Sequence, residues 1–579
     1  MRSFIHLNNI SFSYQERENP NPKVLVNLSL SIKEGEFVAL IGQNGSGKST
    51  LGKLLNALII PDAGDVFIEG MNTHESANYP IIRSRVGMVF QRPQDQIVAT
   101  TVAEDVAFGP GNLGLPPSEI RQQVDEVLAL TGLASYRERP SYLLSAGETQ
   151  RVALAGVLAM RPKCIIFDET TAMLDPSGRE MVMRQAKALN KEGITIIFIT
   201  HLMEEAVQAD RVLILHHGQL VMDAPPAEVF SSSSKIRSYG LDLPPAALAA
   251  DSLRKYFLSL PEGILFEGEL LNVLPEYSGK GKLAEPENHE KIEQDLIIKV
   301  EDLSHVYLRG TPLAHQALEK CNLKVTSGSA HGLIGSTGSG KSTLLQHLNG
   351  LILPQSGRVN VLRYSLNDPE LDVKALRRSV GLAFQQPEDQ IFEQYVGDEI
   401  AFAARNFAIT GKIADIVRSA MQAVGLDFES FKDRVTSTLS GGEQRKVALA
   451  SVLAGQPQVL LLDEPLAGLD PLSRNEITDH LAELKKKGIT LVISTHQFEG
   501  AVELMDKISV LANGRDFAHG TPGKIFSSEN ILDESGIKAP LVARIVGRLR
   551  NLGWPISAEI VTLKDLETSI SSTNTGVEG

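Results

Sequence analysis

Two glycine-rich segments of the chain close in the same Gly-Lys-Ser-Thr sequence, at residues 42–50 and 335–343. Glycines in such a loop let backbone N–H groups converge on phosphates, and the positive end of a following helix faces the same anion. The lysine would supply a fixed charge to the β- and γ-phosphates, and the serine hydroxyl could bind Mg²⁺. A chance glycine turn is the alternative, and two full matches in one chain disfavour it. The predicted phosphate-binding residues are Gly42, Asn44, Gly45, Gly47, Lys48, Ser49 and Thr50 in the first segment, and Gly335, Gly338, Gly340, Lys341, Ser342 and Thr343 in the second.

An apolar run that ends in Asp-Glu follows each glycine-rich segment, at Asp168-Glu169 and at Asp463-Glu464. If the run is a strand, its end places the first carboxylate near a metal ion and the second near the γ-phosphate. We therefore expect the two aspartates to hold Mg²⁺ and the two glutamates to polarise the attacking water as general bases. Acidic residues often follow strands as solvated turns, so this prediction depends on the phosphate loop that precedes each pair.

Two histidines and two tyrosines recur at matching places in the two halves. His201 and His496 each end an apolar run, and we expect them to sense the γ-phosphate, with a structural role as the alternative. Tyr14 and Tyr307 precede the phosphate loops and could stack on adenine through their ring faces, with core packing as the alternative.

A repeated α/β unit must position these residues. Every motif of the first half returns in the second half in the same order, which indicates two copies of one domain fused head to tail. Within each copy, apolar strand runs alternate with helical patterns; in the first half these runs are residues 37–41, 164–167 and 194–199. The sequence therefore predicts buried parallel strands with helices on both faces of the sheet.

The composition along the chain suggests further divisions. A stretch rich in Gly, Pro, Lys and Glu separates the two copies and is typical of a solvated linker. The last residues are mostly Ser, Thr, Asn and Gly, which predicts disorder. The expected parts are a first ATPase domain at 1–222, a first C-terminal extension at 223–271, a linker at 272–295, a second ATPase domain at 296–515, a second extension at 516–567 and a disordered tail at 568–579.

The overall composition excludes several classes of protein. A chain of 579 residues is too long for one hydrophobic core, and its net charge of −14 disfavours a general nucleic-acid binder. The two cysteines, Cys164 and Cys321, lie in apolar runs, so we expect buried thiols and a reducing compartment. The sequence has no secretory signal and no apolar stretch of transmembrane length, so any membrane role would require a partner.

Together these motifs resemble the ATP-binding cassette (ABC) ATPase family. The segment Leu439-Ser440-Gly441-Gly442-Glu443 is similar to the signature loop of that family, which lies in a helical subdomain, and residues 144–148 hold its counterpart. The resemblance implies that two cassettes pair head to tail within the chain and enclose two ATP molecules, each phosphate loop facing the signature of the other copy. One site would contain Lys48, Gln91, Asp168, Glu169 and His201 with Ser440 and Gly442, and the other Lys341, Gln385, Asp463, Glu464 and His496 with Ser145 and Gly147. The same resemblance places Gln91 and Gln385 at the metal ion, and Asp175 and Asp470 in loops through which the sites communicate.

A finer resemblance concerns residues 90–97 and 384–391, which share the pattern Phe-Gln-x-Pro-x-x-Gln. These segments and the two C-terminal extensions are similar to the paired ATPase subunits of energy-coupling factor (ECF) importers. The resemblance implies a motor that uses ATP and Mg²⁺ to energise import of a small molecule, a vitamin or a transition-metal ion. Its partners would be a transmembrane coupling protein and a small membrane substrate-capture protein, and it would lie peripherally at the cytoplasmic face of the cell membrane.

Two departures from the family pattern distinguish the halves. Ala146 replaces the first glycine of the signature, and Thr170 stands where the second half has Pro465. Since both glutamates are present, we expect two hydrolytic sites, with the site completed by Ala146 the slower one. The alternatives are a conventional sugar or peptide importer ATPase and a soluble tandem ABC protein acting on ribosomes or nucleic acid. The short linker of mixed charge disfavours the latter alternative.

Overall fold

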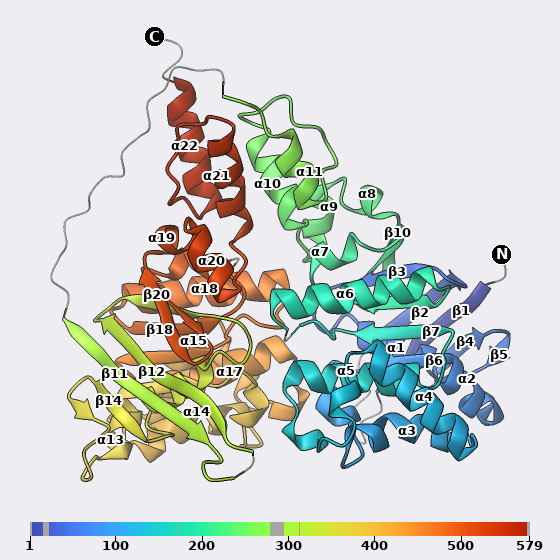
Figure 1. Ribbon diagram of the computed structural model, residues 1–579, viewed down its shortest axis with the longest axis horizontal. Coiled ribbons are helices and arrows are strands. Elements are labelled where there is room, and N and C mark those ends of the chain that lie inside the picture. Colours follow the sequence, from blue (N-terminus) through green and yellow to red (C-terminus); the bar gives the residue numbers. More distant parts are fainter. Residues whose placement is uncertain are drawn as a thin grey trace. The chain divides into compact units, whose positions relative to one another are not determined.

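The computed structural model describes residues 3–14, 23–172, 174–277, 295–311, 313–498 and 500–575. The chain divides into two compact units, Met1–Ala247 and Leu248–Gly579. Each unit contains two sheets and a set of helices, and Figure 1 labels their elements along the chain.

The larger sheet of the first unit has the strand order β10-β9-β3-β8-β7-β6. Five of its strands run parallel, and β10 pairs antiparallel with β9. Every residue of β3, β7 and β8 is buried, as expected for parallel strands covered on both faces. The strands are β3 (Phe37–Ile41), β6 (Val86–Val89), β7 (Cys164–Asp168), β8 (Thr195–Ile199), β9 (Arg211–His216) and β10 (Gln219–Ala224).

The smaller sheet of the first unit is antiparallel, in the order β2-β1-β4-β5. Buried and exposed residues alternate along most of β2, so one face of this sheet packs on the core and the other meets solvent. Its strands are β1 (Ser3–Phe12), β2 (Leu25–Lys33), β4 (Ala63–Ile68) and β5 (Met71–Asn72).

The helices of the first unit include one group, α3, α4 and α5, whose members pack on one another. Thr101 caps α3 and Ser145 caps α5, each in a capping box with a glutamate three residues later. The α-helices are α1 (Lys48–Leu55), α2 (Tyr79–Arg85), α3 (Val102–Asn112), α4 (Pro117–Leu130), α5 (Ala146–Leu158), α6 (Pro176–Lys191), α7 (Met203–Ala206), α8 (Pro226–Val229), α9 (Ser233–Ser238) and α10 (Pro245–Leu253), and the 3-10 helices are η1 (Ser76–Asn78), η2 (Pro93–Gln96), η3 (Ala134–Tyr136) and η4 (Ser141–Leu143).

The second unit repeats both sheets, in the orders β16-β17-β18-β13-β19-β20 and β12-β11-β14-β15. The predicted fold class, two tandem domains with mainly parallel sheets flanked by helices, is thereby confirmed. The strands are β11 (Leu296–Tyr307), β12 (His315–Thr326), β13 (Ala330–Ile334), β14 (Ser356–Val361), β15 (Tyr364–Ser365), β16 (Val380–Ala383), β17 (Val459–Asp463), β18 (Thr490–Thr495), β19 (Lys507–Ala512) and β20 (Arg515–Gly520).

The helices of the second unit follow the same sequence of elements and then continue to the C-terminus. The α-helices are α11 (Glu267–Val273), α12 (Lys341–Leu348), α13 (Val373–Ser379), α14 (Val396–Asn406), α15 (Ile413–Ala423), α16 (Phe428–Phe431), α17 (Gly441–Leu453), α18 (Pro471–Lys486), α19 (Pro522–Phe526), α20 (Glu529–Ser535), α21 (Leu541–Asn551) and α22 (Leu563–Thr575), and the 3-10 helices are η5 (Pro387–Asp389), η6 (Thr436–Thr438) and η7 (Val502–Leu504).

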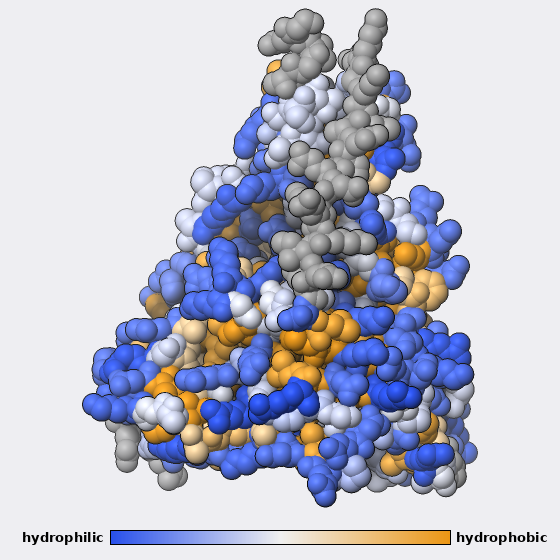
Figure 2. Space-filling model, turned by 90° about the vertical axis from the view of Figure 1, so that its left-hand side faces the viewer, coloured by the Kyte–Doolittle hydropathy of each residue, from blue (hydrophilic) through white to orange (hydrophobic). Residues whose placement is uncertain are grey.

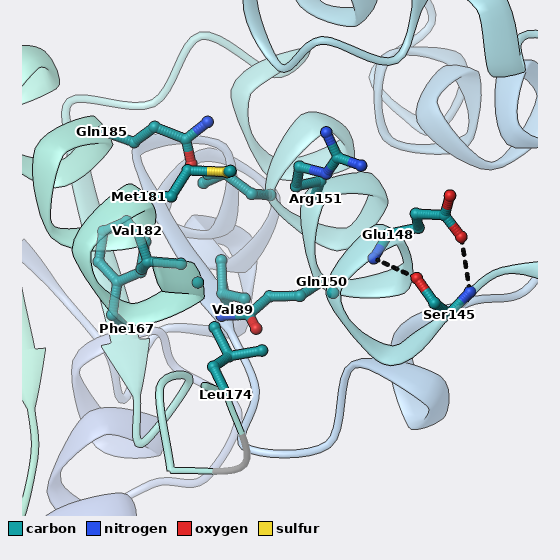
Figure 3. A pocket seen from close by; sticks show the side chains of 13 residues that line it. Val89, Ser145, Glu148, Gln150, Arg151, Phe167, Leu174, Met181, Val182 and Gln185 are labelled. Carbon is teal, nitrogen blue, oxygen red and sulfur yellow. Dashed lines mark hydrogen bonds between the residues drawn. The ribbon is translucent and has the colours of Figure 1, made fainter. Parts of the chain in front are cut away.

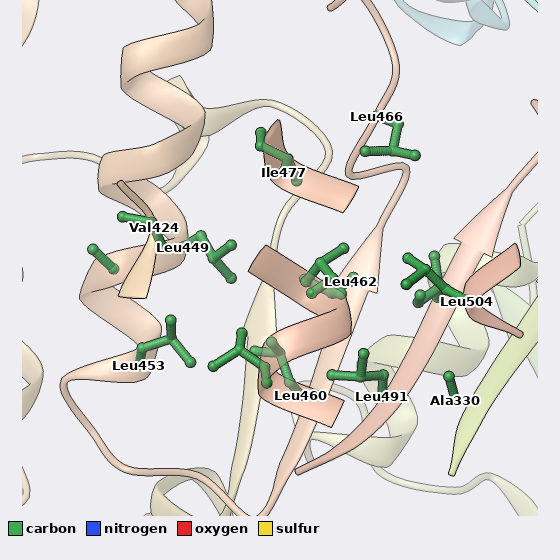
Figure 4. Packing of buried hydrophobic residues seen from close by; sticks show 14 of the residues in the cluster. Ala330, Val424, Leu449, Leu453, Leu460, Leu462, Leu466, Ile477, Leu491 and Leu504 are labelled. Atoms are coloured by element: carbon green, nitrogen blue, oxygen red, sulfur yellow. The ribbon is translucent and has the colours of Figure 1, made fainter. Parts of the chain in front are cut away.

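A continuous apolar core holds the larger sheet of the second unit against its helices. Leu460 of β17 and Leu491 of β18 are fully buried and belong to one cluster with Leu449 of α17 and Ile477 of α18 (Figure 4). Full burial of each such side chain contributes about 1.5–3 kcal/mol. This packing fixes β17 and β18, whose ends carry the candidate catalytic residues.

Residues 248–277 belong to the second compact unit, although they precede the second cassette in the chain. The indole N–H of Trp554 donates to the carbonyl of Pro275 at 2.8 Å, and the ring packs 5.0 Å from both Phe257 and Tyr277, measured between ring centroids. Arg544 lies 2.8 Å from Glu267. The division between the units thus falls within residues 223–271, where we expected one continuous extension.

The predicted disordered tail is replaced by helix over most of its length. Helix α22 runs to Thr575, and Leu566 and Ile570 on it are fully buried. These two apolar residues lie four apart on one helix face. Leu566 belongs to the predicted extension and Ile570 to the predicted tail, so the composition of the tail alone did not reveal the pattern. Residues 576–579 of the tail and residues 278–294 of the predicted linker lie outside the described residues.

Within the described ranges, no helix is both long enough and apolar enough to cross a bilayer. The face of the molecule shown in Figure 2 is largely hydrophilic, with separate apolar areas between charged side chains.

Replacement of Phe257 by alanine is expected to loosen the packing around Trp554. A buried Phe→Ala change costs about 3–5 kcal/mol, and Trp554 is the only tryptophan of the chain, so its fluorescence reports this contact directly. The emission should shift to the red and the urea midpoint of the fluorescence transition should fall. Leu258→Ala is the matched control, because Leu258 is 91% exposed and should leave both quantities unchanged. Equal emission in the two variants would contradict the packing.

Candidate active site

The first phosphate loop connects β3 to α1 and has a conformation that requires glycine. Gly45 and Gly47 have φ angles of 78° and 100°, in the left-handed region that glycine adopts without strain. A Cβ at Gly47 would lie 2.7 Å from a methyl carbon of Leu25. The side chain of Lys48 is buried, and its ammonium donates to the carbonyls of Gly42 at 2.9 Å and Gln43 at 3.0 Å. The lysine charge is therefore held across the loop at the start of α1.

The second loop, between β13 and α12, repeats this geometry. Gly338 and Gly340 have φ angles of 81° and 100°, and the ammonium of Lys341 donates to the carbonyls of Gly335 at 2.8 Å and Ser336 at 2.9 Å. All predicted phosphate-binding residues of each half thus lie together at the turn and first helical turn of their own unit.

The predicted metal-binding aspartates end the strands β7 and β17. The hydroxyl of Ser49 donates to Asp168 at 2.9 Å, and that of Ser494 donates to Asp463 at 2.5 Å. Burial, together with the neighbouring Glu169, raises the pKa of Asp168 to about 6, and burial also raises the pKa of Asp463. In each unit burial outweighs the charge of the nearby lysine, and a bound cation would favour the ionised carboxylate.

The two candidate general bases share a strained backbone. Glu169 and Glu464 have φ angles of 47° and 48°, an uncommon region for a residue with a side chain. In the first unit, the Lys48 ammonium is 3.4 Å from one carboxylate oxygen of Glu169 and the Gln91 amide donates to the other at 3.0 Å. Burial is the largest single influence and opposes ionisation of Glu169, but Lys48 and His201 together outweigh it and lower the pKa to about 2. Glu169 is therefore ionised at neutral pH.

Each candidate histidine lies beside the glutamate of its own unit. Nδ1 of His201 is 3.8 Å from the Glu169 carboxylate, and Nδ1 of His496 is within hydrogen-bonding distance of Glu464, at 2.7 Å. Both histidines are buried. In the second unit Gln385 is fixed through its main chain, where its carbonyl accepts from Arg445 at 3.0 Å.

The tyrosines Tyr14 and Tyr307 keep part of each ring open to solvent. They are 43% and 37% exposed, which is more than core packing would leave. Their hydroxyls lie 3.3 Å from Thr50 and 3.2 Å from Thr343, on the helix that follows each phosphate loop. This geometry suits a ring that stacks on a base beside the phosphates.

The signature residues begin a helix in each unit. Figure 3 shows the Ser145 hydroxyl accepting from the backbone N–H of Glu148, whose carboxylate accepts from the backbone N–H of Ser145 at 2.7 Å. Ser440 and Glu443 make the same capping box in the second unit. Gly147 and Gly442 belong to the first turns of these helices, so their N–H groups lie at the positive helix end. Pairing of each signature with the opposite phosphate loop stays a prediction.

A pocket lies beside the first signature, and two of its residues differ between the units. The pocket lies between α5 and α6, with Arg151 and Met181 at its wall (Figure 3). At the corresponding positions of the second unit, Lys446 and Glu476 form an ion pair at 2.5 Å.

The sequence patterns overlooked a buried carboxylate near the first site. Glu205 on α7 accepts hydrogen bonds from Thr171 at 3.0 Å and from Thr200 at 2.5 Å. An aligned comparison of the two halves would have drawn attention to it, because the second half has Gly500 at that position.

Comparisons with known proteins identify a family for both halves of the chain. The family model described as ABC transporter matches residues 25–172 and 318–467. A protein of Caldanaerobacter subterraneus subsp. tengcongensis, named as an ABC transporter ATP-binding protein, is 33% identical over 558 residues, covering 94% of this chain and 96% of that protein. The energy-coupling factor transporter ATP-binding protein EcfA1 of Clostridioides difficile is 52% identical over 274 residues, covering 47% of this chain and 96% of that protein. The solved structure of cbiO1 from Clostridium perfringens, described as part of the ABC transporter complex cbiONQ, is 35% identical with a TM-score of 0.37, covering 41% of this chain and 94% of that one.

Both halves of the chain match the family model, and one relative is similar along nearly the whole chain. The chain therefore belongs to the ABC transporter family and is an ATP-hydrolysing enzyme with two fused cassettes.

Proposed function

We propose that the protein is the motor subunit of an ECF-type importer for a small molecule. The observation that carries this proposal is that each unit brings a lysine, an aspartate, a glutamate and a histidine around its own phosphate loop, which suits two hydrolytic sites. The similarity of half of the chain to energy-coupling factor ATPases supports the import role. We place the protein peripherally at the cytoplasmic face of the cell membrane, where a transmembrane coupling protein and a small substrate-capture protein would be its partners.

The donor atoms around each loop fit ATP with Mg²⁺. Backbone N–H groups of the loop and the lysine would hold the β- and γ-phosphates. Hydroxyl, carboxylate and amide oxygens are hard ligands of the kind that Mg²⁺ prefers, and when bound the ion would neutralise charge on the phosphates. The residues that would hold it are Ser49, Gln91 and Asp168 in the first site and Ser342, Gln385 and Asp463 in the second.

The chemical step would use the glutamate and histidine of each unit. Glu169 is ionised at neutral pH, so its carboxylate can accept a hydrogen bond from the attacking water and orient it toward the γ-phosphorus. The new P–O bond forms as the bond to the leaving ADP oxygen breaks. His201, beside the same carboxylate, would contact the γ-phosphate. Glu464 and His496 would act in the same way in the second site.

Glu169→Gln and Glu464→Gln should each inactivate one site, so that the hydrolysis rate of the other site can be measured alone. Loss of a general base costs about 10²–10⁴-fold in rate. In single-turnover hydrolysis, Glu169→Gln should retain the lower rate, because its remaining site is completed by Ala146, whose methyl group would crowd the γ-phosphate. Equal residual rates would contradict this asymmetry.

Ala146→Gly in the Glu169→Gln background should restore a faster rate. The reverse change, Gly441→Ala in the Glu464→Gln background, is the matched control and should slow the other site. A Cβ at Gly441 has no neighbour within 4 Å, so this substitution leaves the fold intact.

Exposed aromatic side chains near Gln385 offer a docking surface for a membrane partner. Phe392 and Phe402 are 64% and 42% exposed and lie 4.8 Å apart between ring centroids. Val98 and Phe108 stand at the corresponding places in the first unit and are also exposed. Clustered exposed apolar side chains mark interaction sites.

The double variant Phe392→Ala/Phe402→Ala should lose most membrane-partner recovery and keep its basal ATPase rate, because these side chains lie outside the nucleotide site. The measurement is extraction of native membranes in mild detergent with a C-terminally tagged chain, followed by mass spectrometry. The unsubstituted chain should recover two small polytopic membrane proteins, and Leu258→Ala should match it. Recovery of ribosomal proteins without a membrane partner would instead support the soluble tandem ABC alternative.

A further inference from the structure

One buried carboxylate of the first unit joins two segments that are distant in the sequence. Glu205 on α7 is 6% exposed, and a single oxygen of its carboxylate accepts from the hydroxyl of Thr171 at 3.0 Å and from that of Thr200 at 2.5 Å. Thr200 also accepts from the backbone N–H of Leu202 at 3.0 Å. The two hydrogen bonds to Glu205 thus connect the end of β8 to the segment that follows β7, and the third holds Thr200 in place.

These two segments carry the candidate general base and the candidate phosphate sensor. Thr171 lies two residues after Glu169, and Thr200 directly precedes His201. Nδ1 of His201 is 3.8 Å from the Glu169 carboxylate, beyond hydrogen-bonding distance, and this atom is buried without a partner among the described residues. The backbone N–H of Glu169 donates to the carbonyl of Ile199 at 3.0 Å, and Glu205 adds a side-chain connection between the same two segments.

A cation near Glu205 extends the connection toward the loop of Asp175. The guanidinium of Arg179 donates through Nε to the carbonyl of Leu174 at 3.0 Å, and its charge favours the ionised form of the Glu205 carboxylate. Nη2 of Arg179 and Oε1 of Glu205 are both buried and have no hydrogen-bond partner in the described part of the chain.

The second unit holds its glutamate and histidine in a different way. Leu466 and Gly500 occupy the positions of Thr171 and Glu205, and the hydroxyl of Thr495 donates to the carbonyl of Gln497 at 2.9 Å. There His496 contacts Glu464 directly, through Nδ1 at 2.7 Å and its backbone N–H at 3.3 Å. The direct contact replaces the carboxylate-mediated one.

We propose that Glu205 is a positioning residue of the first ATP site, which sets the distance between Glu169 and His201 and connects both to the Asp175 loop. Its role is confined to the first site, because the second unit has Gly500 in place of the carboxylate and Leu466 in place of Thr171. The proposal concerns ATP hydrolysis alone and does not depend on the membrane partner.

The ionisation of Glu205 should affect the hydrolysis rate of the first site near neutral pH. Burial raises the pKa of Glu205 to about 7, against the hydrogen bonds from the two threonines and the charge of Arg179, while Glu204 raises it further. Since the folded-state pKa is raised, the ionised form that attracts Arg179 is lost as the pH falls below about 7.

The test is Glu205→Gln in the Glu464→Gln background, in which only the first site hydrolyses ATP. We expect a rate about tenfold lower in single turnover, because a misplaced catalytic group costs rate before it costs binding. The dissociation constant for ATP should be unchanged, and the rise in rate between pH 6 and 8 should flatten. Glu204→Gln is the matched control, because Glu204 is adjacent but exposed. It should leave the rate at pH 8 and the dissociation constant for ATP unchanged and keep the rise in rate with pH, displaced to lower pH because Glu204 raises the pKa of Glu205.

The Glu169→Gln background distinguishes an effect on positioning in the first site from a general loss of protein stability. Glu205→Gln in the Glu169→Gln background leaves only the second site active and should not change its rate. An equal loss in both backgrounds, or an unchanged rate and pH profile in the first, would overturn the proposal. Thr171→Val, which removes one hydrogen-bond donor and keeps the carboxylate, should give a smaller loss confined to the first site. If Glu205→Gln does not fold, this variant decides the question by the same criteria.

Discussion

The rest of each cassette depends on charged side chains being buried together at the carboxyl end of a parallel sheet. In the first unit Lys48, Asp168 and Glu169 are all nearly inaccessible to solvent, and a buried charge is costly unless it is paired. The lysine charge helps to keep Glu169 ionised, while burial raises the pKa of Asp168 to about 6. Burial of the apolar strands β3, β7 and β8 contributes stability that offsets the cost of burying these charges. Because the strands are parallel, their charged ends lie at one edge of the sheet.

Much of the phosphate site could be predicted from the sequence, because the residues that perform the chemistry also determine the local backbone structure. A glycine loop works only between a strand and a helix, so its residues predict both the phosphate site and the elements on either side. The polar ends of apolar runs at Asp168 and His201 likewise locate strand ends. The repeat then extended each conclusion to the second half, and the family comparisons agree with it.

Other features could not be predicted because they depend on contacts between distant residues. The composition of the C-terminal tail suggested disorder, yet Leu566 and Ile570 are buried on α22. The packing of Trp554 on Phe257 joins segments that no local pattern connects. Glu205 could not be identified from the sequence for the same reason. Its partners Thr171 and Thr200 are far apart in the sequence, and threonine at these positions matches no motif.

Fusion of two cassettes in one chain gives a physical reason for the differences between them. A homodimer must use one sequence for both sites, so any change at the signature or beside the general base appears twice. A fused chain supplies two different halves in a fixed one-to-one ratio and at high effective concentration, so each half can change alone. Ala146 in one signature, the Lys446–Glu476 ion pair in one unit and the Glu205 network in the other are differences of this kind. These differences lie outside the lysine, aspartate, glutamate and histidine that both halves retain, which suits two sites that perform the same reaction at different rates.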